Sequence, residues 1–129
     1  MSDDTNDDYL NYLSQLRKTL EVASADPVEQ CEIMGSYNAP WELKTDAGDF
    51  IGSVLSLQRG QLNAATVDRL TEFKRLLQDL PDAAVIPEGE SMTTFAGCLV
   101  AFKHPSWVPV RQSASELLSI VSDPFAEPR

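Results

Sequence analysis

The stretch that decides the fold is Asn63-Ala64-Ala65-Thr66-Val67-Asp68-Arg69-Leu70-Thr71-Glu72-Phe73-Lys74-Arg75-Leu76-Leu77-Gln78-Asp79-Leu80-Pro81. Its hydrophobic periodicity is the clearest in the chain. Apolar residues recur every three or four positions, which predicts one buried stripe along an α-helix. The stripe consists of Val67, Leu70, Phe73, Leu77 and Leu80. Asn63 precedes the helix as a capping residue, and Pro81 ends it. Glu72 and Arg75 are spaced for an ion pair.

The residues before this stretch predict two further helices. The first runs from residue 8 to about residue 23, and its stripe consists of Tyr9, Tyr12, Leu13, Leu16, Leu20 and Ala23. Asp26-Pro27-Val28-Glu29 then starts a second helix, because Asp26 can cap it and Pro27 suits the first helical position. This second helix carries Val28, Cys31 and Met34, and Gly35 can end it.

The residues after this stretch predict two more helices. One spans about residues 92–103, with a stripe of Met92, Phe95, Leu99 and Phe102 and with Cys98 beside it. His104-Pro105 interrupts the pattern, and Trp107 or Pro109 starts the last helix. Its inward-facing residues are Val110, Ala114, Leu117, Leu118 and Val121.

Residues 44–57 allow two interpretations. Asn38 is placed to cap a helix with Pro40 in its first turn, and Phe50, Ile51, Val54 and Leu55 have helical spacing. Gly48 and Gly52 weaken a helix, however, and Thr45-Asp46-Ala47-Gly48 suits the turn of a hairpin. We favour a helix over about residues 47–57.

The predicted segments are helical and joined by short connections, which favour antiparallel neighbours. We therefore expect an all-α fold, a compact single-domain bundle of about five to seven short helices. The domain spans residues 1–129, with residues 1–7 and 123–129 as flexible tails.

The charge balance excludes some classes of partner. Twenty Asp and Glu residues face ten Lys and Arg residues, giving a formal net charge of −10. Such a field repels nucleic acid and anionic membranes and speeds encounter with cationic proteins, although acidic charge also serves solubility alone. The acidic N-terminus lacks the basic start of a secretory signal, and no run reaches the roughly 18 apolar residues of a membrane span. We therefore expect a cytoplasmic protein.

No pattern in the chain predicts catalysis or metal binding. Cys31 and Cys98 lie in apolar helical patterns without ligand spacing, so we interpret them as reduced core residues. His104 is the single histidine, and its place at a helix C-terminus indicates a structural role, with a partly cationic ring favoured by the helix dipole. Phosphate-binding glycine motifs are absent, and Asp46-Ala47-Gly48-Asp49 resembles a calcium loop only superficially. We expect no enzyme and no cofactor.

Two acidic stretches are the main indication of a binding surface. Residues 21–49 hold seven acids and one base, Lys44, while residues 79–90 hold four acids and no base. Tyr37 and Trp41 lie inside the first stretch, and aromatic anchors ringed by charge are typical of protein-binding hot spots. The alternatives are two solvated acidic faces and two aromatic rings that belong to the core. The predicted contact residues are Glu29, Glu32, Tyr37, Trp41, Glu42, Asp46 and Asp49.

These features favour a protein that binds and neutralises a protein partner with a basic surface. The most concrete form is an immunity or antitoxin-type inhibitor of a toxin, by analogy of class. A second hypothesis is an acidic chaperone or adaptor for an exported protein. A third is a helical enzyme or ligand-binding domain of unknown chemistry. The oligomeric state does not follow from the sequence.

Overall fold

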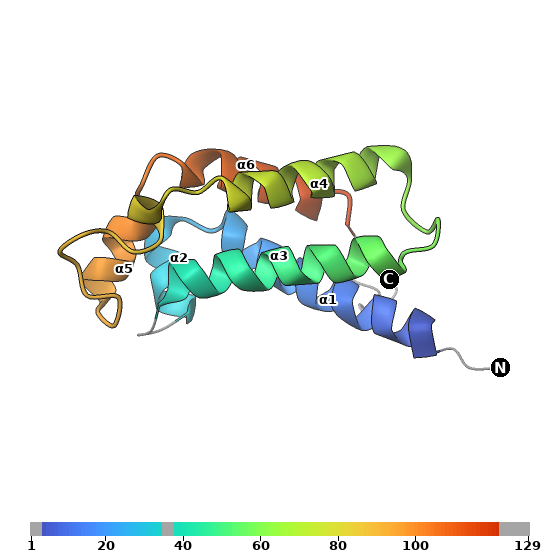
Figure 1. The fold of residues 1–129 in the computed structure, drawn as a ribbon, viewed down its shortest axis with the longest axis horizontal. Coiled ribbons are helices and arrows are strands. Elements are labelled where there is room, and N and C mark those ends of the chain that lie inside the picture. The colour runs from blue at the N-terminus through green and yellow to red at the C-terminus, as the bar shows by residue number, and fades with distance from the viewer. Residues whose placement is uncertain (1–3, 35–37, 122–129) are drawn as a thin grey trace.

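The computed structural model describes residues 4–34 and 38–121, and over these ranges it is built from helices and contains no strand (Figure 1). The elements are α1 (Asp4–Ser24), α2 (Pro27–Met34), α3 (Ala39–Leu57), α4 (Ala64–Gln78), the short 3-10 helix η1 (Asp82–Ala84), α5 (Phe95–Phe102) and α6 (Trp107–Leu118). The prediction of an all-α bundle is therefore confirmed. Within the same ranges, no helix combines the length and the apolar character needed to cross a membrane.

Four long helices form the body of the bundle. Helix α1 packs against α3 and α6, and α4 packs against the same two helices from the opposite side. The colour gradient in Figure 1 shows that each helix runs antiparallel to the neighbours it packs against. This is the arrangement that short connections favour.

The remaining elements lie together at one end of the bundle, on the left in Figure 1. Helix α2 lies in the connection from α1 to α3, whereas η1 and α5 lie in the connection from α4 to α6. Helix α2 packs against α5, and α5 packs against η1. We call α2, η1 and α5 the end cap.

The core is formed by the predicted stripes of the long helices. In α4, Leu70, Phe73 and Leu77 are buried, as is Leu80 just beyond the helix, while Val67 is half-buried. The Asn63 side chain caps this helix by accepting a hydrogen bond from the Thr66 backbone N–H, at 2.8 Å. The helix ends at Gln78, three residues before Pro81.

Helix α1 is longer than predicted. It begins at Asp4, so residues 4–7 of the expected tail are helical. The rest of the expected tails, residues 1–3 and 123–129, lies outside the described residues. The predicted apolar stripe of α1 is buried except for Tyr12, which is 38% exposed and lies beside the ring of Phe50.

Residues 44–57 are helical, so the hairpin interpretation is wrong. They belong to α3, which starts at Ala39, directly after the Asn38 cap, and so eight residues before the predicted start near residue 47. A Cβ atom at Gly48 would meet nothing within 4 Å, and Gly52 is likewise outside the core, near the Lys74 ammonium group. Each glycine costs a helix about 1 kcal/mol. Burial of Leu43, Ala47, Ile51 and Val54 on the opposite face offsets this cost.

Two predicted faces in the end cap are confirmed only in part. Helix α5 covers only Phe95–Phe102, and Phe95 is 47% exposed, whereas Gly97, Cys98, Ala101 and Phe102 are buried. This helix is apolar on nearly every side, so its periodicity cannot select the inner face. In α2, Val28 is exposed, while Cys31 is buried as expected. Gly35, the predicted end of α2, lies outside the described residues.

A buried polar cluster joins the end cap to the long helices. The Gln30 side chain is fully buried, and its Nε2 donates to the carbonyl oxygens of Val22 and Ala23 at 3.1 and 3.2 Å. These carbonyls belong to the last turn of α1, where the regular helical hydrogen bonds end, and that of Val22 also accepts from the backbone N–H of Ala25 at 3.1 Å. Arg111 of α6 donates from Nη2 to the carbonyl oxygen of Phe102 and, at 3.5 Å, to Oε1 of Gln30. The cluster therefore connects α1, α2, α5 and α6.

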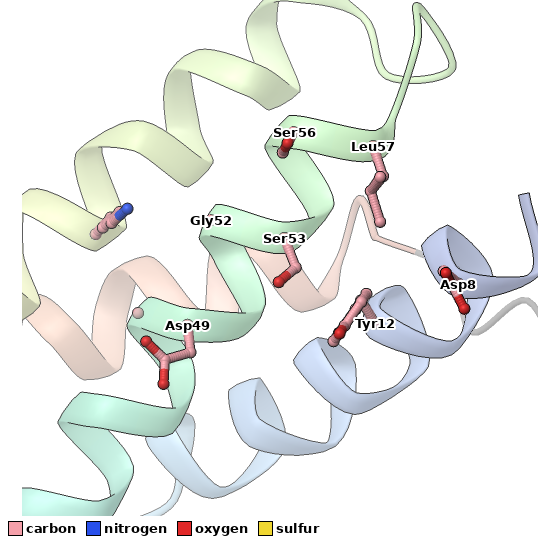
Figure 2. Close-up of a pocket in the computed structure, with 9 residues that line it drawn as sticks. Asp8, Tyr12, Asp49, Gly52, Ser53, Ser56 and Leu57 are labelled. Atoms are coloured by element: carbon pink, nitrogen blue, oxygen red, sulfur yellow. The ribbon is translucent and has the colours of Figure 1, made fainter. Parts of the chain in front are cut away.

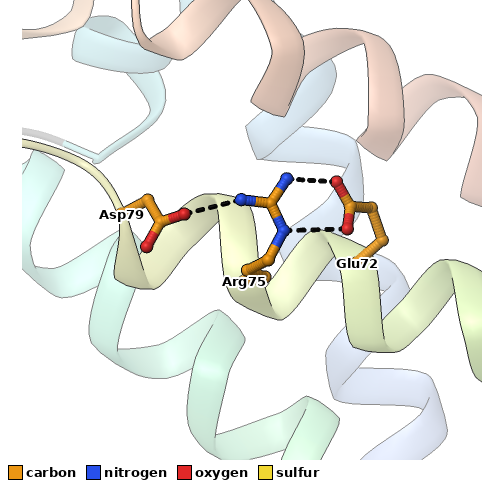
Figure 3. Close-up of polar contacts among 3 residues, drawn as sticks. All are labelled: Glu72, Arg75 and Asp79. Carbon is orange, nitrogen blue, oxygen red and sulfur yellow. Dashed lines mark hydrogen bonds and ion pairs between the residues drawn. The ribbon is translucent and has the colours of Figure 1, made fainter.

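The outer face of α4 carries the predicted ion pair. Arg75 donates from Nε to Glu72 at 2.9 Å and pairs with the second carboxylate oxygen through Nη2 (Figure 3). Its Nη1 also pairs with Asp79 at 2.6 Å, an ion pair that was not predicted. The hydrogen bond from Arg75 lowers the pKa of the Glu72 carboxyl below its ordinary value.

Candidate functional site

The predicted contact residues are spread over α2 and the first three turns of α3. Glu29, Glu32, Trp41, Asp46 and Asp49 are exposed, and Glu42 is half-buried. Tyr37 lies outside the described residues. The structure does not gather this set into one site, because the members on α3 face different neighbouring helices.

Trp41 is exposed, so the interpretation of this ring as a core residue is wrong. Asn38 caps α3 by accepting a hydrogen bond from the backbone N–H of Trp41, at 3.3 Å. Leu43 and Ala47 set the inner face of the helix, and Trp41 lies away from it with 47% of its surface exposed. A large aromatic side chain is therefore presented to solvent at a fixed position, on the first turn of a capped helix.

Trp41 lines a surface pocket of about 480 Å³ together with Lys44, Asp82, Val85 and Ile86. We call it the Trp41 pocket. Ile86 is 55% exposed, so two large apolar side chains face solvent here. Asp82 belongs to the second acidic stretch and Trp41 to the first. The fold thus brings residues of both acidic stretches to one pocket, although about 40 residues separate Trp41 from Asp82 in the sequence. The first stretch contributes Trp41 and Lys44, and the acid in the lining is Asp82.

The far wall of the Trp41 pocket is held by a buried tryptophan. Trp107 of α6 is fully buried, and its Nε1 donates to the carbonyl oxygen of Ala84 in η1, at 2.8 Å. Backbone bonds from Val85 and Ile86 to the carbonyl oxygen of Asp82, at 3.0 and 2.7 Å, close the turn. The pocket is therefore supported from the core rather than formed by a free loop.

Two of the predicted acids on α3, Asp46 and Asp49, lie in separate hollows. Asp46 lines a small pocket of about 150 Å³ between α1 and α3, where Lys18 also lies. Asp49 lines an open groove of about 570 Å³ over the outer face of α3. Figure 2 shows Asp8 and Tyr12 entering this groove from α1, opposite Ser53 and Asp49 of α3. Two carboxylates, the Lys74 ammonium and several hydroxyls line the groove, without histidine or cysteine.

Sequence reasoning missed Asp82, Val85 and Ile86. The signal available for them was indirect, namely the second acidic stretch and its loop-like composition. Nothing in the sequence paired that loop with Trp41, because the pairing depends on how η1 docks against α6.

His104 closes a local turn between α5 and α6. The backbone N–H of Ser106 donates to His104 Nδ1 at 3.1 Å, and the Ser106 hydroxyl lies 2.8 Å from the same nitrogen. A backbone N–H can only donate, so Nδ1 is the acceptor in this hydrogen bond. This contact fits the expected structural role of His104.

No cluster of three or more His, Cys, Asp or Glu side chains suited to a metal ion occurs in residues 4–34 and 38–121. Comparisons of the chain with protein-family models, with curated proteins and with solved structures found no match.

Proposed function

We propose that this protein binds a protein partner with a basic surface, and that the Trp41 pocket is the centre of the contact. The observation that carries the proposal is the exposure of Trp41 and Ile86 on one supported pocket, where both acidic stretches meet. In its most concrete form, the protein is an immunity or antitoxin-type inhibitor that acts in the cytoplasm and neutralises a toxin by direct binding.

The chemistry of the pocket favours a cationic side chain of the partner. A guanidinium group stacks on a tryptophan face and pairs with a carboxylate. Trp41 and Asp82 supply those two groups in one pocket. Lys44 lines the same pocket and repels a cation. Reversal of its charge therefore tests whether the partner presents a cationic group there.

The acidic surface and the pocket have separate kinetic roles in this proposal. The net charge of −10 acts over distance and speeds encounter, and salt screens it within about 10 Å at 0.1 M ionic strength. Short-range packing on Trp41 sets the rate of dissociation. Charge substitutions should therefore change association, and Trp41 substitutions should change dissociation.

The test uses a partner isolated on the immobilised protein, identified by mass spectrometry and purified. Stopped-flow association is then measured at several salt concentrations. We expect the association rate to fall as salt rises and to fall further in a Glu29→Lys, Glu32→Lys double variant. Lys44→Glu should raise the association rate, because it removes the single base of the first acidic stretch. If the association rate is independent of salt and is unchanged by both sets of charge reversals, the acidic surface is not the recognition element.

Trp41→Ala should weaken binding by about 2 kcal/mol or more, roughly 30-fold in Kd, through faster dissociation. Ile120→Ala is the matched control, because Ile120 is 45% exposed, lies just beyond α6 and does not line the Trp41 pocket. Equal effects of the two substitutions contradict the pocket as the contact centre. A partner whose activity is unchanged by saturating protein contradicts neutralisation, even if binding is tight.

A further inference from the structure

We propose that Cys31 and Cys98 form a redox-active pair that closes an intramolecular disulfide between α2 and α5. The two sulfur atoms lie 2.8 Å apart, although 67 positions separate the residues in the sequence. Both thiols are free and buried. The inference does not depend on the identity of a partner.

The two cysteines come from the two connections that form the end cap, Cys31 from the α1–α3 connection and Cys98 from the α4–α6 connection. Cys31 lies on the inner face of α2, beside the buried Gln30, and Cys98 lies on the inner face of α5. Gln30 and Arg111 hold these helices to α1 and α6 through hydrogen bonds that are partly or fully buried. The S–S bond of a disulfide is about 2.05 Å long, so less than about 1 Å of approach separates the thiol pair from the bonded state. Small side-chain rotations cover such a distance.

The same burial that holds the thiols together makes them slow to react. Burial raises the pKa of both thiols, that of Cys98 to about 12. The reactive thiolate is therefore scarce while the end cap is closed, and oxidation proceeds through transient opening of α2 or α5. These helices have eight residues each, and short peripheral elements open at lower free energy than the body of a bundle.

The step is a thiol–disulfide exchange with a disulfide oxidant. The Cys31 thiolate attacks one sulfur of the oxidant and releases its other half as a thiol. The Cys98 thiolate then attacks the mixed disulfide at Cys31 and releases the second half as a thiol. The protein loses two protons and two electrons and gains one S–S bond, while the S–S bond of the oxidant is reduced to two thiols. The product fixes α2 to α5 and encloses a long loop of the chain.

The experiment uses the full chain and oxidised glutathione as the probe. The protein and oxidised glutathione are incubated until the reaction reaches equilibrium, at a urea concentration below that of the unfolding transition. Under these conditions the end cap can open while the protein stays folded. We expect a monomer lighter by about 2 Da, with no thiol left to titrate after denaturation and both thiols recovered on addition of dithiothreitol. The melting temperature should rise by roughly 10 °C on oxidation, because the crosslink restricts a long loop of the unfolded chain.

Cys98→Ala and Cys31→Ala are the matched controls. Each leaves one thiol, so oxidised glutathione can give only a mixed disulfide or no reaction, without the rise in melting temperature. The proposal is overturned if the wild-type monomer keeps both thiols at equilibrium. It is also overturned if each cysteine of the wild type carries its own glutathione, or if oxidation lowers the melting temperature.

Discussion

Replacement of Trp107 by phenylalanine tests whether the buried tryptophan supports both the core and the Trp41 pocket. Trp107 is fully buried, its Nε1 donates to the carbonyl oxygen of Ala84 at 2.8 Å, and its ring centroid lies 4.9 Å from that of Phe102. Phenylalanine keeps one ring against Phe102 but removes the donor. The Ala84 carbonyl is then left without this hydrogen bond inside the protein.

The expected cost has two parts. A buried polar group that loses its partner costs about 1–3 kcal/mol. The missing part of the indole leaves a void of roughly 40 Å³, and at about 24 cal/mol per Å³ that void costs about 1 kcal/mol, with a similar term for lost transfer energy. We therefore expect Trp107→Phe to lower the free energy of unfolding by about 3–5 kcal/mol.

Guanidinium unfolding followed by far-UV circular dichroism measures this cost, and Trp41→Phe provides a control of identical chemistry. Trp41 is 47% exposed, so its replacement should change stability by no more than about 0.5 kcal/mol. The chain has two tryptophans, so each variant also reports the environment of the other ring by fluorescence. A cost below about 0.5 kcal/mol for Trp107→Phe, or equal costs for the two variants, would refute this account of the core.

Three further perturbations test other parts of the fold. Leu77→Ala should lower the free energy of unfolding, measured in urea, by about 2–5 kcal/mol, because Leu77 is 1% exposed on the α4 stripe. A loss typical of surface positions would mean that the inner face of α4 is misassigned. Gly97→Ala should destabilise the protein by about 1–3 kcal/mol, since the added Cβ would lie 2.0 Å from the Ser91 carbonyl oxygen; an unchanged melting curve contradicts that close approach. Glu72 has a pKa lowered by Arg75, so its contribution to stability is complete above its unfolded pKa and is lost as pH falls through the lower folded pKa. Unfolding of wild type and Arg75→Gln at pH 2–6 should therefore show a stability difference that shrinks towards the acid end, and a difference independent of pH contradicts the pairing.

The body of the bundle could be predicted from local pattern. The stripes of α1, α4 and α6 are confirmed at Leu16, Leu70 and Leu117, all of which are fully buried. These helices have polar residues on one side and apolar residues on the other, so the periodicity itself identifies the inner face. The caps at Asn38 and Asn63 were likewise predictable, because a side-chain cap needs only the next three residues.

The end cap could not be predicted in the same way. Helix α5 is apolar on nearly all sides, and its inner face was decided by the small residues Gly97 and Ala101, which allow close packing. The exposure of Trp41 was also undecided in the sequence, because a tryptophan in a capped first turn can face the core or the solvent.

The sequence by itself determined that the chain is acidic and helical, where the helix capped by Asn63 starts, and which faces of the clearest helices turn inward. Each of these properties depends on residues within one or two helical turns of one another. The tertiary structure alone decided which distant residues meet. It placed Trp41 beside Asp82 and Ile86, and Cys31 beside Cys98, because two separate connections pack together at one end of the bundle. Such contacts depend on the docking of whole elements, which no local pattern of residues encodes.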